Sequence, residues 1–186
     1  MPDPRRVAIL ISGRGSNMRA LVEQAKDYDV VLVASNKPQA DGLRWARDHG
    51  IETWSVDSKG MAKDEYDRLL SATLEEHEVG TIALAGFMRI LSPWFVAHWK
   101  GRILNIHPSL LPKYRGLDTH ARAIAAGDPV SGCSVHLVTE ELDAGEVLGQ
   151  AEVEIRAGDT VEALEARVLA AEHDLYPHVL NAFVTR

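Results

Sequence analysis

Two polar side chains, Asn105 and His107, stand at the end of a short apolar run, in the stretch NIHPSLLPKYRG at residues 105–116. In a strand, residues i and i+2 face the same side, so both side chains would emerge together at the carboxyl end of that strand. An amide beside an imidazole suits acyl transfer, because the amide can stabilise an oxyanion while the imidazole moves a proton. A structural role for this pair is the alternative, because many histidines cap strands and turns.

A second candidate site is the glycine-rich stretch SGRGSN at residues 12–17, between an apolar run and an amphipathic segment. A turn of this kind can direct backbone N–H groups at an anion such as a phosphate. It is not the dinucleotide-binding fingerprint, because Met18 replaces the third glycine, and it lacks the GK[ST] of a P-loop. Two interpretations stay open: a mononucleotide phosphate site and an ordinary strand-to-helix turn.

Weaker candidates lie in two other loops. Asp143 precedes Ala-Gly in the stretch TEELDAGEV, where it would either orient His107 or bond the backbone of its own turn. Met88 and Arg89 follow another apolar run, and we expect both to be exposed and to frame an apolar pocket with a cationic rim. The loop 108–120, which contains two prolines and a glycine, is predicted to be a mobile flap.

Apolar runs and helical spacing alternate along the chain and predict its elements. The expected strands cover residues 7–11, 29–35, 51–56, 79–86, 102–106, 132–140 and 147–155. The expected helices cover residues 15–26, 40–50, 62–78, 92–99 and 120–128, with a long last helix from 161 to 171 or beyond. The third helix is predicted to present one face made of Tyr66, Leu69, Leu70, Thr73 and Leu74.

This alternation is typical of an α/β protein with a Rossmann-like, mostly parallel sheet and helices on both faces. No linker or repeat interrupts the sequence, so we expect a single domain over residues 1–186. Ligands of such sheets bind at the carboxyl ends of the strands. Asn105, His107 and the glycine-rich turn are all predicted to lie at that edge.

Composition and charge exclude several classes of function. Hydrophobic residues make up 46% of the 186 residues and charged residues 25%, as in ordinary globular proteins. The formal net charge of −7 argues against nucleic-acid binding, and no stretch is long enough to span a bilayer. The apolar run 7–11 is too short for a signal peptide, which favours a cytoplasmic protein. The only cysteine, Cys133, is expected to be a buried thiol, and the eight histidines form no metal-binding motif.

Five stretches together resemble the phosphoribosylglycinamide formyltransferase (GAR transformylase) family of folate-dependent formyltransferases. ISGRGSN, LAGFMRILSP, NIHPSLLPKYRG, SVHLVTEELDAG and EHDLYP occur in the order and spacing of that family, over essentially the whole chain. The resemblance implies transfer of a formyl group from 10-formyltetrahydrofolate to the amine of 5′-phosphoribosylglycinamide, in de novo purine synthesis. It further implies small-molecule substrates as the partners, no metal, and a monomer or homodimer.

The resemblance assigns catalysis to Asn105, His107 and Asp143. The half of the chain up to about residue 100 would hold the ribonucleotide phosphate, and the half from about 101 to 186 would carry the folate pocket and the catalysis. Two positions depart from the family pattern: Lys63 stands where an Arg is found, and Asp118 stands where a His is common. The first change replaces a bidentate contact with a point charge.

Two groups of binding residues follow from the same resemblance. The ribonucleotide group consists of Gly15, Ser16, Asn17 and Glu172. The folate group consists of Lys63, Met88, Arg89, Ile90, Leu91, Asn105, Thr139, Glu140, Glu141, Leu142 and Asp143.

Other functions remain as alternatives. Related enzymes hydrolyse formyltetrahydrofolate, or transfer formyl to an amino sugar or to aminoacyl-tRNA. The hydrolases usually carry an additional N-terminal domain and the tRNA enzyme a C-terminal one, and we expect neither in this sequence. A silent nucleotide-binding module that uses only the glycine-rich turn is a further alternative, but it has no use for Asn105, His107 and Asp143 together.

Overall fold

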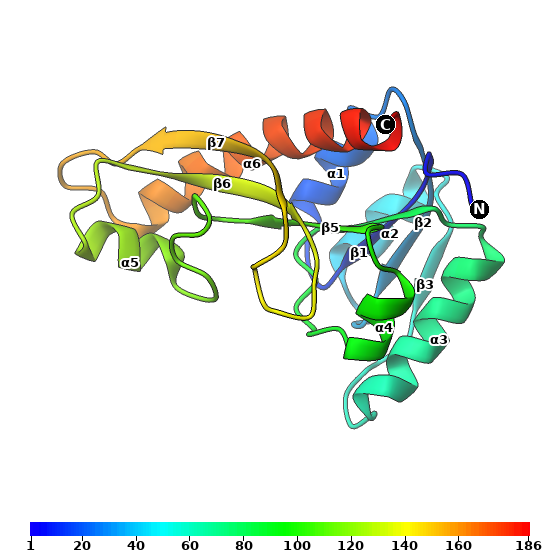
Figure 1. The fold of residues 1–186 in the computed structure, drawn as a ribbon. Coiled ribbons are helices and arrows are strands. Elements are labelled where there is room, and N and C mark those ends of the chain that lie inside the picture. The colour runs from blue at the N-terminus through cyan, green and yellow to red at the C-terminus, as the bar shows by residue number, and fades with distance from the viewer.

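The computed structural model describes residues 1–186 as seven strands and six helices (Figure 1). The strands are β1 (Arg6–Ile11), β2 (Asp29–Ser35), β3 (Thr53–Ser55), β4 (Thr81–Leu84), β5 (Ile103–His107), β6 (Val130–Leu137) and β7 (Val147–Glu154). The helices are α1 (Ser16–Glu23), α2 (Asp41–Asp48), α3 (Lys63–Glu76), α4 (Pro93–His98), α5 (Thr119–Ala125) and α6 (Val161–Val184).

All seven strands form one sheet in the order β3-β2-β1-β4-β5-β6-β7. The first five of these pair in parallel, and β6 and β7 extend the sheet by antiparallel pairing. The predicted α/β class with a mostly parallel sheet is therefore confirmed. The short β3 lies at an edge, as expected from its sequence.

Two apolar cores lie on opposite faces of the sheet. Residues of α1, α2 and α6 pack on one face, and residues of α3 and α4 pack on the other (Figure 1). Alternate residues of β1 serve the two cores, with Ile9 in the first and Leu10 in the second. A strand buried on both faces must be apolar at every position, which is why the run at residues 7–11 predicts it.

Helix α3 buries Tyr66, Leu70 and Leu74 of the predicted face, but the buried face is rotated from the predicted one. Leu69, expected in the core, is 46% exposed, whereas Asp67 is fully buried. Burial of a carboxylate requires hydrogen-bond partners, and Asp67 Oδ2 accepts the backbone N–H of Ser92 at 2.6 Å. The predicted face was wrong at these positions because a carboxylate normally marks the solvent side of a helix.

Helix α6 runs for 24 residues along the sheet and continues through Pro177. The Tyr176 hydroxyl lies 3.0 Å from the Leu84 carbonyl oxygen and 3.1 Å from that of Leu104, which fixes α6 against β4 and β5. No helix of the structure has both the length and the apolar character needed to cross a membrane.

Candidate active site

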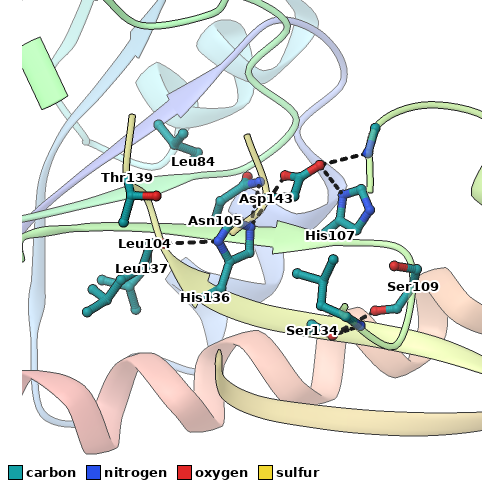
Figure 2. A network of polar contacts seen from close by, with 12 residues as sticks. Leu84, Leu104, Asn105, His107, Ser109, Ser134, His136, Leu137, Thr139 and Asp143 are labelled. Atoms are coloured by element: carbon teal, nitrogen blue, oxygen red, sulfur yellow. Dashed lines mark hydrogen bonds and ion pairs between the residues drawn. The ribbon is translucent and has the colours of Figure 1, made fainter. Parts of the chain in front are cut away.

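Four polar side chains meet beside the carboxyl end of β5: Asn105, His107, His136 and Asp143 (Figure 2). Strand β5 supplies the first two, which lie on the same side of the strand, as predicted. His136 comes from β6, where the antiparallel register places it opposite Asn105. Asp143 comes from the loop between β6 and β7 and closes the cluster. We refer to these four residues as the transfer network.

His107 is held through both ring nitrogens. Its Nε2 lies 2.8 Å from the carbonyl oxygen of Tyr114. Because a carbonyl only accepts hydrogen bonds, Nε2 carries a proton. Its Nδ1 lies 3.4 Å from Asp143 Oδ2, and each of these two side chains is only 7% exposed. A ring protonated at both nitrogens satisfies both partners, and in that form it can donate a proton.

Asp143 sits in a tight turn that a glycine makes possible. Its own φ is 50°, in the left-handed region. A Cβ at Gly145 would lie 1.7 Å from the Leu137 carbonyl oxygen, so this position admits no side chain. The Asp143 carboxylate accepts the backbone N–H of Gly116 at 2.9 Å. It thus reaches across to another loop and to His107, so the alternative of a carboxylate bonded to its own turn is wrong.

His136 is a site residue that the sequence analysis missed. Its Nδ1–H donates to the Leu137 carbonyl at 3.0 Å, and burial lowers the pKa of His136 below its usual value. In the neutral ring, Nε2 accepts from the Asn105 amide at 3.4 Å. The 3.6 Å contact of Nε2 with Asp143 Oδ1 is then not an ion pair. His136 thereby orients the Asn105 amide, whose second N–H stays available.

The flap that follows β5 packs against this network. Tyr114 contributes the carbonyl that binds His107, and its hydroxyl donates to Asp128 at 2.6 Å. Arg115 forms a 3.0 Å ion pair with Glu141 in the loop that carries Asp143. The flap is therefore tied to the network and to the neighbouring loop at several points. The mobility predicted for it stays a prediction.

The ribonucleotide group gathers at the start of α1. Gly15 precedes the helix with φ 76°, and no side chain caps the first turn. The first backbone amides of a helix have no partner within it, so they are available to an anion. Asn17 Nδ2 donates to Glu172 Oε2 at 2.8 Å, although 155 residues separate the two. The structure thus brings these predicted residues together, and burial raises the pKa of Glu172.

A hollow of about 280 Å³ opens beside the glycine-rich turn. Arg14 and Lys37 are among its lining residues, together with Asp41 and Asp57, so the lining carries charges of both signs. Ser12, at the end of β1, donates to Asn36 Oδ1 at 2.6 Å and accepts the backbone N–H of Met88 at 2.8 Å. The turn is therefore joined directly to the loop after β4.

The folate group divides between two loops and the start of α3. In the loop after β4, Met88 is 72% exposed and Ile90 68% exposed, whereas Leu91 is buried. Leu142, in the loop between β6 and β7, is 59% exposed. Three large apolar side chains are thus open to solvent at the edge where the sheet presents Asn105. In Figure 2, Leu84 and Thr139 lie on the side of the transfer network that is away from His107.

Apart from Arg89, the remaining predicted folate residues outside the network are polar and exposed. Glu140 is exposed beside Glu141, whose backbone carbonyl accepts from the Thr139 hydroxyl at 3.1 Å. Lys63 is exposed in the first turn of α3. Its ammonium group has no ion-pair partner within the chain, so it is open to an external anion.

Arg89 differs from the expectation. Its side chain is only 15% exposed, so it forms no cationic rim. The guanidinium lies over the Tyr66 ring, with its carbon 4.7 Å from the ring centre, and its Nε is 3.9 Å from Asp67 Oδ1. It turns inward because α3 offers a buried carboxylate and an aromatic face, neither of which is apparent in the sequence.

Comparisons with known proteins agree with this arrangement. A family model described as formyl transferase matches residues 5–180. The chain is 46% identical over 182 residues to phosphoribosylglycinamide formyltransferase of Escherichia coli. This match covers 95% of the chain and 86% of that protein. It is also 48% identical over 181 residues to the trifunctional purine biosynthetic protein adenosine-3 of Gallus gallus, where it spans 95% of the chain and only 18% of the relative.

Solved structures give the same result. The crystal structure of phosphoribosylglycinamide formyltransferase from Brucella melitensis superposes with a TM-score of 0.92 at 48% identity, covering 98% of this chain and 96% of that one. The family match covers nearly the whole chain. The Escherichia coli and Brucella melitensis proteins are each more than 40% identical to this chain, and the matched region is most of their own length. The chain therefore belongs to the formyl transferase family.

Proposed function

We propose that the chain transfers the formyl group of 10-formyltetrahydrofolate to the amine of 5′-phosphoribosylglycinamide. The products are formylglycinamide ribonucleotide and tetrahydrofolate, in de novo purine synthesis. The main observation in support of the proposal is that Asn105, His107 and Asp143 lie together in one network of polar contacts. That network lies in a chain nearly half identical to enzymes named for this reaction.

The ribonucleotide phosphate binds at the start of α1. The free amides after Gly15 and the open first turn at Ser16 supply hydrogen bonds and the positive end of the helix dipole. Asn17 and Glu172, which are hydrogen-bonded to each other, hold the sugar and glycinamide side. This geometry directs the substrate amine along the sheet edge toward β5.

The folate lies against the apolar surface of Met88, Ile90 and Leu142. Its formyl group then reaches Asn105, and Lys63 offers a cation to the carboxylates of the folate tail. The ribonucleotide turn thus belongs to residues up to about 100, and the transfer network belongs to residues from about 101. Glu172 and the loop after β4 cross that division, so the two halves act as one site.

The reaction begins when the substrate amine attacks the formyl carbon. A carbon–nitrogen bond forms, and the carbonyl π electrons move to the oxygen, which becomes an oxyanion. The Asn105 N–H that His136 leaves free donates to that oxygen, a contact that strengthens as the charge develops.

Collapse of the intermediate breaks the bond from the formyl carbon to the folate nitrogen. His107 donates a proton to that nitrogen, and Asp143 holds the imidazolium in position and accepts the proton that the amine loses. The oxyanion electrons re-form the carbonyl of the product amide. Asp143 then passes the amine proton to His107 Nδ1, so the carboxylate and the imidazolium are both restored and the network returns to its starting state.

A simple assay tests this function. The purified protein is mixed with glycinamide ribonucleotide and 10-formyltetrahydrofolate, and the deformylated folate is followed by absorbance. We expect product only when both substrates are present. Folate deformylation without the ribonucleotide would instead support a hydrolase. Deformylation only with an amino sugar or with aminoacyl-tRNA would support the other family activities.

A further inference from the structure

Two buried charged atoms face each other behind the loop after β4, and neither has a hydrogen-bond partner. They are Asp67 Oδ1 on α3 and Arg89 Nε on the loop, 3.9 Å apart. The Asp67 side chain is completely buried and that of Arg89 is 15% exposed. Because a buried charge is costly unless it is paired, each group is the natural partner of the other.

The other oxygen of Asp67 holds the end of the same loop. Asp67 Oδ2 accepts the backbone N–H of Ser92 at 2.6 Å, and Ser92 in turn caps α4 by accepting the N–H of Phe95. One carboxylate therefore contacts both the guanidinium within the loop and the residue at which the loop becomes a helix. The start of the loop is held separately, by the Met88 N–H that donates to Ser12 Oγ.

These anchors determine what the loop presents to solvent. Arg89 points inward, onto the Tyr66 ring and Asp67. Its neighbours Met88 and Ile90 point outward and are 72% and 68% exposed. The loop thus presents the two residues beside Arg89 outward while it holds Arg89 itself inward. The apolar surface thus depends on where Arg89 is held.

We propose that Asp67 is a positioning residue for the folate site, acting through Arg89 to hold Met88 and Ile90 in place for the folate ring. The inference rests on the function proposed above and adds a residue that does not touch substrate. The negative charge is the essential property, because without it Arg89 Nε has no buried partner. Only the Tyr66 ring and two long hydrogen bonds, from Nη2 to the Ala62 and Lys63 carbonyl oxygens at 3.5 and 3.4 Å, then hold the guanidinium. Rotation of the guanidinium toward water carries the two apolar side chains away from their positions.

The test distinguishes the effect of the Asp67 charge on Arg89 from the effect of the Asp67 hydrogen bond to Ser92. Asp67→Asn keeps the size of the side chain and an oxygen that can accept the Ser92 N–H, but removes the charge opposite Arg89. We expect the KM for 10-formyltetrahydrofolate to rise about tenfold, the effect of losing one charge-assisted contact. The KM for glycinamide ribonucleotide and the kcat at saturation should change less than about twofold, because the variant leaves the transfer network intact.

A double-mutant cycle shows whether the effect passes through Arg89. Adding Asp67→Asn to Arg89→Gln should raise the folate KM no further, because the guanidinium is already absent. Additive effects of the two substitutions on the folate KM, an unchanged folate KM in Asp67→Asn, or an equal rise in both KM values would each overturn the proposal. A wild-type protein without transfer activity would instead refute the proposed function.

Ser71→Ala is the matched control for loss of packing between α3 and α4. The buried Ser71 hydroxyl, one turn along α3, accepts from Trp99 Nε1 at 2.9 Å and does not contact the loop. We expect this variant to lower the melting temperature and to leave both KM values unchanged. If it raised the folate KM as much as Asp67→Asn does, the effect would be one of stability, and the positioning role would be refuted.

Discussion

The ribonucleotide turn and the transfer network are built from different parts of the chain. The turn at Gly15 and Ser16 offers main-chain amides at a helix start and uses few side chains. The transfer network consists of side chains from β5, β6 and the loop before β7, each held by another member or by a loop carbonyl or amide. A main-chain site is present whenever the fold is present, whereas a side-chain network can lose function while the fold stays intact.

This contrast leads to different responses to substitution. In the network, removal of one side chain removes a chemical step. In the turn, removal of a side chain leaves the amides in place, so only an added charge or added bulk should interfere. The predictions below test that difference, from the largest effect to the smallest.

His107→Ala should lower kcat by about 10²- to 10⁴-fold, the usual contribution of a general acid–base group. Single-turnover assays, with circular dichroism to verify the fold, measure this effect. His49→Ala is the control, because His49 is an exposed histidine stacked on Trp45, outside the network. Near-normal turnover of the His107 variant would remove this residue from the mechanism.

Asn105→Ala should lower kcat by roughly 10²- to 10³-fold, because an oxyanion donor acts mainly in the transition state. Asn105→Asp should be at least as damaging, since a second carboxylate near Asp143 would repel the developing charge. Comparison of kcat for the two variants at saturating substrates is the measurement. An aspartate variant more active than the alanine variant would contradict the oxyanion role.

Ser16→Asp should raise the KM for the ribonucleotide by about 10- to 100-fold, because like charges a few ångströms apart repel by on the order of a few kcal/mol. The KM for the folate should stay the same. Ser16→Ala is the matched control and should have little effect, since the amides remain. Equal weakening of both substrates in the aspartate variant would indicate a folding defect.

Glu172→Gln should stabilise the protein at pH 8 by about 1 kcal/mol, the usual size of one such change. Burial raises the folded-state pKa of Glu172 above its ordinary value of 4.5. The Glu172 carboxyl group therefore stays protonated up to a higher pH in the folded state than in the unfolded state. Stability from this group is lost as the pH rises from the ordinary value through the raised one.

Urea unfolding at pH 4 and pH 8 checks this sign. The stability gain of the glutamine variant should be present at pH 8 and vanish at pH 4, where the wild-type side chain is protonated in both states. The Asn17 amide can still donate to the new oxygen, so we expect the ribonucleotide KM to rise less than about tenfold. A gain of equal size at both pH values would contradict the assigned cause.

The sequence analysis named three of the four network residues, and the pattern of apolar runs predicted the fold and two of the three, Asn105 and His107, for one physical reason. Strands buried on two faces must be apolar, so the parallel strands can be recognised in the sequence as apolar runs. Polar residues that interrupt such a run, such as Asn105 and His107, are therefore conspicuous. His136 did not stand out, because its partner Asn105 is 31 residues away. Only the antiparallel register of β5 and β6 places the two opposite each other.

The inward direction of Arg89 was unpredictable for a related reason. Its partner Asp67 lies in a helix whose sequence suggests a solvent-facing carboxylate, and Leu69 two residues later suggests a core position. Hydrophobicity alone therefore assigns both residues of α3 to the wrong side. Pairing between distant charged groups decides such cases, and a linear pattern contains no information about which groups pair.

The turn that holds Asp143 is sensitive to any mutation of Gly145. Every single-base change of a glycine codon that alters the residue introduces a side chain, and the smallest of them would place its Cβ 1.7 Å from the Leu137 carbonyl oxygen. No neighbouring side chain can move aside to relieve that clash, because the obstacle is the backbone of β6 itself. A mutation at Gly145 therefore has to displace β6 or the loop, whereas the exposed Glu140 and Leu142 can change without meeting that obstacle.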